Sequence, residues 1–170
     1  GPQTVTRAAG TFALVLVPTR ELAMQTHEAV EQLSRPFPWL VTSTLMGGER
    51  KKAEKARLRK GVGVLVATPG RVADHLRSTA AFVVSACQLL VLDEADLLLE
   101  LGFRPALDEI ITALDERAAP GAPRRQSALL SATLPAALKD LAGRSLTDPV
   151  TVNASAAAAA AAPPPKKRAA

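Results

Sequence analysis

The sequence predicts a doubly wound α/β domain, with a parallel sheet inside and helices on both of its faces. Apolar runs of strand length alternate about six times with longer amphipathic or charged stretches of helix length. The runs are apolar throughout, as expected where both faces of a parallel sheet are covered. One of them ends in the carboxylates Asp93, Glu94 and Asp96, at the position where open α/β sheets hold ligands.

The composition is that of one ordinary globular domain. The chain has 170 residues, of which 48% are hydrophobic, enough for a sizeable core and too many for a disordered protein. A single cysteine, Cys87, excludes a disulfide framework and fits a reducing compartment. No apolar run reaches the roughly 18 residues of a membrane span and no signal peptide opens the chain, so no membrane partner is expected.

The charge balance favours a nucleic acid as partner. The net charge is +5, which promotes association with a polyanion. Aromatic side chains are scarce, with one Trp, four Phe and no Tyr, and this argues against recognition of single strands by base stacking. The sugar–phosphate backbone is therefore the expected contact.

The first half of the chain is predicted to hold three strands. Residues 12–17 form an apolar strand, and Thr19 is the expected N-cap of a helix that ends near Leu33. The inner side of this helix is predicted to carry Leu22, Met24, Ala29, Val30 and Leu33. A short strand at 40–45 precedes the turn at Gly47 and Gly48. A second buried strand at 62–67 leads through Thr68–Arg71 into a helix that ends near Arg77.

Residues 49–60 are the most basic segment, with seven basic and two acidic side chains. A charge run of this kind usually forms the solvated face of a helix, and that interpretation is favoured here. Two histidines, His27 and His75, have no partners at metal-binding spacing and are predicted to lie on the surface.

The second half repeats the alternation after the acidic strand at 89–93. A helix at 104–117, a strand at 127–130, a helix at 135–146 and a last strand at 150–152 are predicted. Residues 154–170 combine polyalanine, prolines and the basic triplet at 166–168, and are predicted to be a disordered tail. The expected organisation is one domain over residues 1–153, followed by this tail; the triplet is also compatible with a nuclear-import patch.

The acidic turn has two interpretations when it is taken alone. Carboxylate oxygens at a strand end suit Mg²⁺, held through water against the phosphates of a nucleotide. In the alternative, Asp93 caps the turn while Glu94 and Asp96 are solvated surface side chains.

Four distinctive strings follow predicted strands: Pro18-Thr-Arg-Glu-Leu-Ala23, Thr68-Pro-Gly-Arg71, Asp93-Glu-Ala-Asp96 and Ser131-Ala-Thr133. In this order they resemble motifs Ia, Ib, II and III of the first RecA-like domain of the DEAD-box RNA helicases, and Gly47-Gly48 resembles the GG element of that family. The resemblance covers about residues 12–153. Residues 46–61 also resemble the nucleolar subfamily that acts in assembly of the large ribosomal subunit.

The resemblance implies an ATP site in which Asp93 holds Mg²⁺ through water and Glu94 orients or deprotonates the attacking water. Asp96 would bond to the turn containing Ser131 and Thr133; without the resemblance, these two side chains would be assigned to a local turn. RNA would be held by its backbone, with strong salt dependence and little sequence preference. The implied RNA contacts are Thr19, Arg20, Gly47, Gly48, Thr68, Pro69, Gly70 and Arg71.

The printed sequence contains no GxxxxGK[ST] phosphate-binding loop. The resemblance places that loop upstream of Gly1, on a central strand expected to lie beside the Asp93 strand, and it also implies a second RecA-like domain as a partner. A RecA-like sheet without the phosphate-loop strand is therefore expected. This chain alone is expected neither to hydrolyse ATP nor to unwind RNA.

The expected parent function is ATP-dependent remodelling of RNA duplexes during ribosome biogenesis, by a monomer in the nucleus, specifically the nucleolus. Two other functions remain open: a DNA translocase of the same superfamily, and a catalytically incompetent RecA-like fragment that docks RNA or protein. An incomplete gene model would also explain the absent loop.

Overall fold

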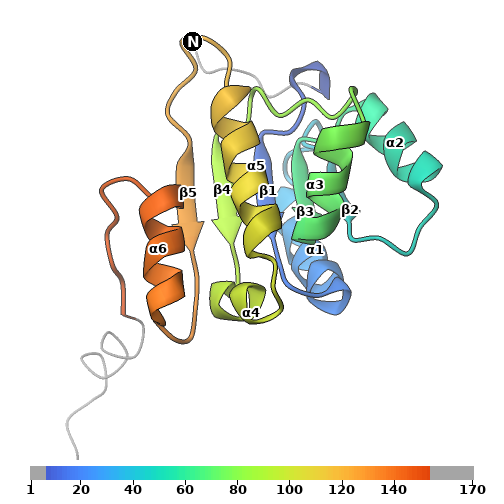
Figure 1. Ribbon diagram of the computed structural model, residues 1–170. Coiled ribbons are helices and arrows are strands. Elements are labelled where there is room, and N and C mark those ends of the chain that lie inside the picture. Colours follow the sequence, from blue (N-terminus) through green and yellow to red (C-terminus); the bar gives the residue numbers. More distant parts are fainter. Residues whose placement is uncertain (1–6, 154–170) are drawn as a thin grey trace, which may run out of the picture.

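Five short parallel strands form the centre of the computed structural model, which describes residues 7–153 (Figure 1). Their order across the sheet is β2-β3-β1-β4-β5, with all neighbours parallel. The strands are β1 (Ala13–Leu16), β2 (Thr42–Leu45), β3 (Val64–Ala67), β4 (Leu89–Leu92) and β5 (Gln126–Leu129). The predicted RecA-like α/β sheet is confirmed, and each of these strands begins and ends within two residues of its expected limits.

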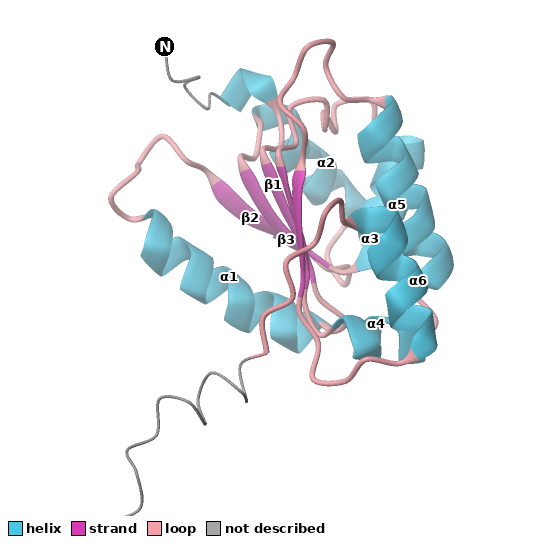
Figure 2. Ribbon diagram, turned by 90° about the vertical axis from the view of Figure 1, so that its left-hand side faces the viewer, coloured by secondary structure: helices cyan, strands magenta, loops and turns pink. Residues whose placement is uncertain are grey.

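Helices cover both faces of the sheet, but unequally. Figure 2 shows α1 alone on one face, and α3, α5 and α6 on the other. The helices are α1 (Arg20–Ser34), α2 (Lys51–Lys60), α3 (Pro69–Ser78), α4 (Ala95–Glu100), α5 (Arg104–Glu116) and α6 (Ala136–Ser145), preceded by the short 3-10 helix η1 (Arg7–Ala9). Within residues 7–153 no helix has the length and apolarity needed to cross a membrane.

The core has two parts because strand side chains alternate between the faces. Leu14 and Leu16 of β1 pack with the buried side chains of α3 and α5, such as Ile110. Val15 and Val17 face the other way and form a smaller cluster under α1. Both faces of the central strand are therefore apolar, which explains the continuous apolar runs in the sequence.

The predicted inner side of α1 is partly wrong. Ala23 is fully buried and Val30 packs on the sheet, but Met24 is 59% exposed and Leu33 is 76% exposed. Ala29 is also exposed. Since α1 is the one helix described on its face and contacts mainly β2 and β3, a large part of its surface has no layer to pack against.

The expected position of the missing strand is also wrong. The Asp93 strand, β4, is paired on both sides, with β1 and β5. Among the described strands, the edges of the sheet are β2 and β5. A strand from elsewhere could therefore pair with β5, but it could not pair with β4.

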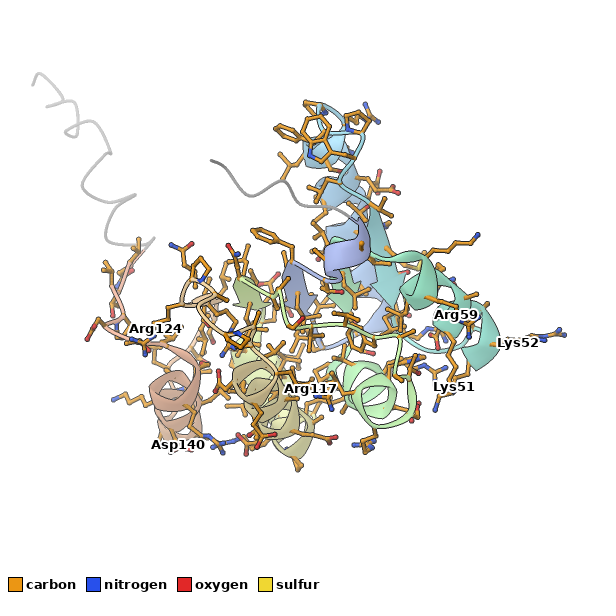
Figure 3. The ribbon with its side chains drawn as sticks, turned by 90° about the horizontal axis from the view of Figure 1, so that it is seen from above. Lys51, Lys52, Arg59, Arg117, Arg124 and Asp140 are labelled. Atoms are coloured by element: carbon orange, nitrogen blue, oxygen red, sulfur yellow. The ribbon has the colours of Figure 1, made fainter. Side chains whose placement is uncertain are left out.

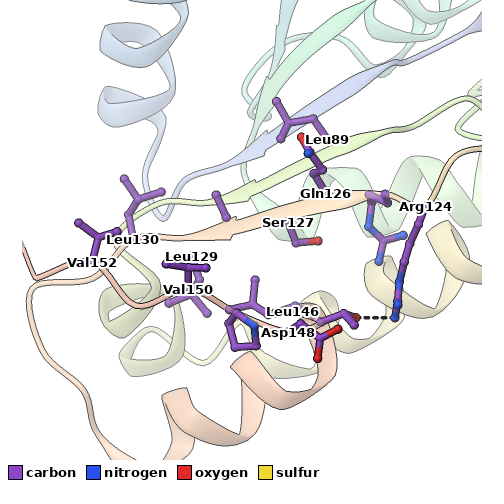
Figure 4. Close-up of a pocket in the computed structure, with 15 residues that line it drawn as sticks. Leu89, Arg124, Gln126, Ser127, Leu129, Leu130, Leu146, Asp148, Val150 and Val152 are labelled. Carbon is purple, nitrogen blue, oxygen red and sulfur yellow. Dashed lines mark hydrogen bonds between the residues drawn. The ribbon is translucent and has the colours of Figure 1, made fainter.

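Residues 150–152 were predicted as a strand, and the structure assigns them no secondary structure. An open slot of about 920 Å³ separates this segment from β5 (Figure 4). This edge slot is lined on one side by residues 124–130 and on the other by residues 145–150 and Val152. Val150 and Val152 are 88% and 80% exposed, because the segment has no neighbouring strand to pair with. The predicted disordered tail at 154–170 lies outside the described residues.

Candidate functional site

All the motif residues predicted from the sequence lie at one edge of the sheet. The strands are parallel, so the segments that follow them emerge together at the carboxyl edge, the lower edge in Figure 1. We call the segments after β2, β3 and β1 the basic half; they carry Thr19, Arg20, Gly47, Gly48, Thr68, Pro69, Gly70 and Arg71. The segments after β4 and β5 form the acidic half; they carry Asp93, Glu94, Asp96, Ser131 and Thr133.

The acidic half begins with a strained turn. The Asp93 N–H donates to Leu16 O at 2.9 Å, so this residue is still held to β1. Its Oδ1 accepts the Glu94 N–H at 2.9 Å, which is the capping role considered for it. Glu94 has φ 48° and ψ 51°, in the left-handed region that non-glycine residues seldom adopt. Such strain is concentrated at functional sites, and here it leaves the Glu94 side chain exposed at the edge.

Asp96 joins the turn after β4 to the turn after β5. Its Oδ2 accepts two hydrogen bonds from Thr133, at 2.8 Å from Oγ1 and at 3.2 Å from the backbone N–H. Ser131 supports the same turn, since its Oγ donates to Thr133 O at 2.7 Å. The expected bond between Asp96 and this turn is therefore present, and Ser131 also makes the local turn bond that was the alternative.

These contacts stabilise the charged form of Asp96. The Thr133 hydroxyl, and then Ser131, hold the pKa of Asp96 below its ordinary value of 3.8. A carboxyl with a depressed folded-state pKa adds stability above its unfolded pKa, and this stability is lost as the pH falls through the folded value.

We expect the Asp96→Asn chain to be less stable than the unmodified chain at pH 7 and to lose less stability on acidification. The difference between the two should shrink as the pH falls below the ordinary pKa of an aspartate, 3.8, because the unfolded chain then binds a proton at Asp96 that the folded chain binds only at lower pH. Urea unfolding at a series of pH values measures this difference in the free energy of unfolding. Thr133→Val, which removes the main cause of the pKa shift, should reduce the pH dependence in the same direction; an unchanged profile in both variants would contradict the assignment.

A pocket of about 510 Å³ lies beside this turn and is lined by Asp93, Glu94, Asp96, Leu97, Glu100, Leu130, Ser131 and Ala132. Within residues 7–153, no cluster of three or more carboxylate, histidine or cysteine side chains could enclose a metal ion. The carboxylates therefore do not fit a metal bound by protein alone. They do fit Mg²⁺, which keeps several waters and uses one or two carboxylates together with substrate phosphates.

In the basic half, two arginines lie against the two glycines of the turn after β2. Gly47 and Gly48 have φ of 77° and 80°. A Cβ on Gly48 would lie 2.4 Å from Nη2 of Arg20, and a Cβ on Gly47 would lie 3.7 Å from Nε of Arg71. Residues far apart in the sequence are thus brought together, and the cluster is positively charged and open to solvent on the Arg20 and Gly48 side.

Gly48→Ala is expected to lower the free energy of unfolding by about 1 kcal/mol, because a Cβ is unfavourable at positive φ. It should also displace the Arg20 guanidinium and weaken binding to an RNA oligonucleotide. Gly121→Ala is the matched control, with φ 74° and nothing within 4 Å of the new Cβ. It should show the same loss of stability in urea with unchanged RNA affinity; equal weakening by both variants would assign the effect to backbone strain.

The start of α3 contributes fewer accessible residues to the basic half than the sequence predicts. Thr68 has the extended backbone of an N-cap, but its side chain makes no capping hydrogen bond, and Pro69 stands at the first helical turn. An added Cβ at Gly70 would only touch Phe103 at 3.8 Å, so neither conformation nor crowding requires glycine there. Gly70 and Arg71 remain the accessible residues of this motif, whereas Thr68 is 9% exposed.

Two residues behind the basic half were missed. The prediction that His75 lies on the surface is wrong, since it is 0% exposed, and Glu54, within the charge run, is 1% exposed. The run is a helix, α2, that buries Glu54 and Leu58 and turns Lys52 and Arg59 to solvent (Figure 3). The spacing of Arg71, His75 and Thr79, four residues apart on one helix face, was the available signal.

Comparison with known proteins identifies the family. The profile described as DEAD/DEAH box helicase matches residues 3–141. The chain belongs to this family. The helicase ATP-dependent RNA helicase dbp7 of Emericella nidulans is 50% identical over 159 residues, covering 91% of this chain and 20% of the relative. The human protein named ATP-dependent DNA helicase DDX31 is 48% identical over 149 residues, covering 88% of this chain and 17% of the relative.

The fold of this DEAD/DEAH box chain is also found in a solved structure. The crystal structure of the yeast DEAD-box splicing factor Prp28 superposes with a TM-score of 0.79 at 28% identity, covering 85% of this chain and 34% of that protein. The chain thus spans about a fifth of the length of the two relatives and a third of the solved chain.

Proposed function

We propose that this chain is the part of an ATP-dependent RNA helicase that carries the acidic ATP-hydrolysis turn and half of an RNA-binding surface. The observation that carries the proposal is the position of the five motif segments, side by side at the carboxyl edge of one parallel sheet. The acidic half suits the nucleotide, and the basic half suits a phosphate backbone. Relatives whose names include ATP-dependent RNA helicase support this division.

On the nucleotide side, Asp93 and Glu94 have different tasks in the proposal. Asp93, fixed by the backbone of β1 and of Glu94, would hold Mg²⁺ through water. The cation would neutralise charge on the β- and γ-phosphates. Glu94, exposed on its left-handed turn, orients the attacking water or accepts its proton. Asp96 links this turn to Thr133 through its two hydrogen bonds, and Ser131 supports Thr133 in the same turn.

On the RNA side, Arg20 and Arg71 bind phosphates of the backbone. Gly47 and Gly48 let that backbone approach the turn after β2, because no side chain projects there. Thr19 and Gly70 complete the surface, whereas Thr68 and Pro69 are buried and support the start of α3 behind it. Base edges are not read, so little sequence preference is expected.

The phosphate-binding loop is proposed to enter on a strand that fills the edge slot beside β5. Its carboxyl end would then lie next to the pocket of Asp93 and Glu94, because β5 and its neighbours are parallel. The second RecA-like domain is proposed to close on the same edge of the sheet. The whole helicase is proposed to act as a monomer in ribosome assembly in the nucleolus. If the phosphate-binding loop and the second domain are absent from the protein, the alternative function applies, in which the domain docks RNA or protein without hydrolysing ATP.

DNA is the second candidate substrate, since the human relative is named an ATP-dependent DNA helicase. The proposal is tested by fluorescence anisotropy of the printed chain with a single-stranded RNA of about ten nucleotides and with DNA of the same sequence. Tighter binding to RNA, lost with rising salt and weakened by Arg20→Ala, is expected. Equal or tighter binding to DNA would favour the DNA translocase.

The competence of the chain itself is a separate question. A fluorescent ATP analogue titrated with Mg²⁺ into the printed chain is expected to show no saturable binding, because the phosphate cradle is not among its residues. Binding that Asp93→Asn abolishes would mean that the acidic turn holds a nucleotide without that cradle.

A further inference from the structure

One face of α3 is directed at a single buried carboxylate on α2. Arg71, His75 and Thr79 follow one another at intervals of four residues, so they share that face. Arg71 Nε lies 3.0 Å from Glu54 Oε2, and His75 Nε2 lies 3.0 Å from the same oxygen. His75 Nδ1 lies 2.8 Å from Thr79 Oγ1. The contacts form a continuous chain from Thr79 through His75 and Glu54 to Arg71.

Burial distinguishes this chain of contacts from the other ion pairs nearby. Glu54 is 1% exposed and His75 is 0% exposed, whereas the side chains of the neighbouring pair Lys51 and Asp74 are 38% and 33% exposed. A carboxylate can only accept hydrogen bonds, so His75 Nε2 must carry its proton toward Glu54. His75 is itself fixed by Thr79, and Glu54 therefore has one orientation.

Glu54 engages the inner nitrogen of the Arg71 guanidinium, and the two outer nitrogens face different neighbours, one on the segment after β2 and one on α3. Nη2 donates to Glu49 O at 3.4 Å, and Nη1 lies 3.6 Å from Asp74 Oδ2. Arg71 is 23% exposed, beside Gly47. Because the guanidinium is planar, fixing Nε fixes the plane in which the two outer nitrogens meet a phosphate.

We propose that Glu54 and His75 are positioning residues, which orient Arg71 for contact with the RNA backbone. The inference rests on the proposed function, since it requires Arg71 to touch RNA. Apolar residues of similar volume would join α2 to α3 equally well or better, so a purely structural role does not explain a buried carboxylate with two nitrogen partners. A guanidinium held ready loses less freedom on binding than a free one.

The experiment is a double-mutant cycle on RNA affinity in the full printed chain, with Glu54→Leu, Arg71→Ala and the double variant. Each single variant is expected to weaken binding about tenfold, the scale of one charge-assisted hydrogen bond. Each should reduce the slope of log affinity against log salt by about 0.7, the value for one phosphate contact. The double variant should bind no more weakly than Arg71→Ala.

Two variants separate positioning from stability. Glu54→Gln keeps an oxygen that accepts from Arg71 Nε, and should restore affinity to within about twofold of the unmodified chain. Leu58→Ala removes another buried side chain of α2 without touching Arg71, and should lower the melting temperature with RNA affinity unchanged. If Glu54→Leu does not fold, His75→Leu takes its place in the cycle.

The outcomes are distinguishable. If Arg71→Ala binds RNA as well as the unmodified chain, the proposed contact of Arg71 with RNA is wrong, and the positioning role is wrong with it. If Arg71→Ala weakens binding but Glu54→Leu does not, or if the two losses multiply in the double variant, the positioning role is wrong and the proposed function stands. Weakened RNA binding by Leu58→Ala, equal to that of Glu54→Leu, would also overturn it.

Discussion

Replacing Glu94 by Gln is expected to stop ATP hydrolysis and to leave ATP binding intact, once this chain stands in a helicase with a phosphate-binding loop. The loss should be about 10²- to 10⁴-fold in the rate of phosphate release, the usual contribution of a positioned acid or base. The expectation follows from the turn itself. Glu94 is held at positive φ with an exposed carboxylate, while Asp93 beside it is tied to the backbone of β1.

The measurement needs a chimaera in which residues 12–141 of this chain replace the matching segment of the human relative DDX31. Phosphate release with and without RNA gives the rate, and titration with a fluorescent ATP analogue gives the affinity. Glu100→Gln is the control, because Glu100 is an exposed carboxylate lining the same pocket, at the last residue of α4. Hydrolysis that survives Glu94→Gln but not Glu100→Gln would reverse the assignment.

The buried strands could be predicted from the sequence because their information is local. The apolar runs that became β1 and β3 are buried on both faces, because helices pack on both sides of the sheet, so pattern and structure agree. In β4, every second residue is only partly buried. The motif residues could be placed at one edge for the same reason: each follows a strand, and parallel strands end together. The link from Asp96 to Thr133 needed the resemblance, since 37 residues separate the partners.

The errors came from non-local properties. Strand order is fixed by packing between distant segments, so the sequence did not show that β1 and β5 would occupy both sides of β4. The strand predicted at 150–152 depends on a neighbour that the described residues do not supply. The burial of Glu54 and His75 was not predicted, because a count of charges along the sequence does not say which way each side chain points. Only the rotation of α2 relative to α3 directs the Glu54 carboxylate of this basic helix inward.

Filling the edge slot with an added strand is expected to have the second large effect, a change in the stability and in the amide exchange of the chain. In a chain lengthened upstream with the matching phosphate-loop segment of the human relative, the added strand is expected to pair with β5. The outer backbone groups of β5 and the exposed valines 150 and 152 would then be buried together. In the printed chain, β5 should exchange its amides faster than the central strand β1.

Hydrogen exchange of both chains measures the pairing, strand by strand. Protection should rise in β5 and at residues 150–152, whereas β2, the other edge of the sheet, serves as the internal control and should not change. A point variant adds a second readout. Val150→Asp should change the free energy of unfolding of the printed chain by no more than about 0.5 kcal/mol, because the side chain is 88% exposed.

The same Val150→Asp substitution is expected to cost the lengthened chain about 1–3 kcal/mol, since a carboxylate would then stand beside a filled slot. Protection at β2 in place of β5, or an equal effect of Val150→Asp in both chains, would contradict the placement. The consequence for function is direct. A strand that pairs with β5 has its carboxyl end beside the pocket of Asp93 and Glu94. The phosphate-binding loop and the acidic turn are therefore adjacent only if the added strand pairs with β5 and not with β2.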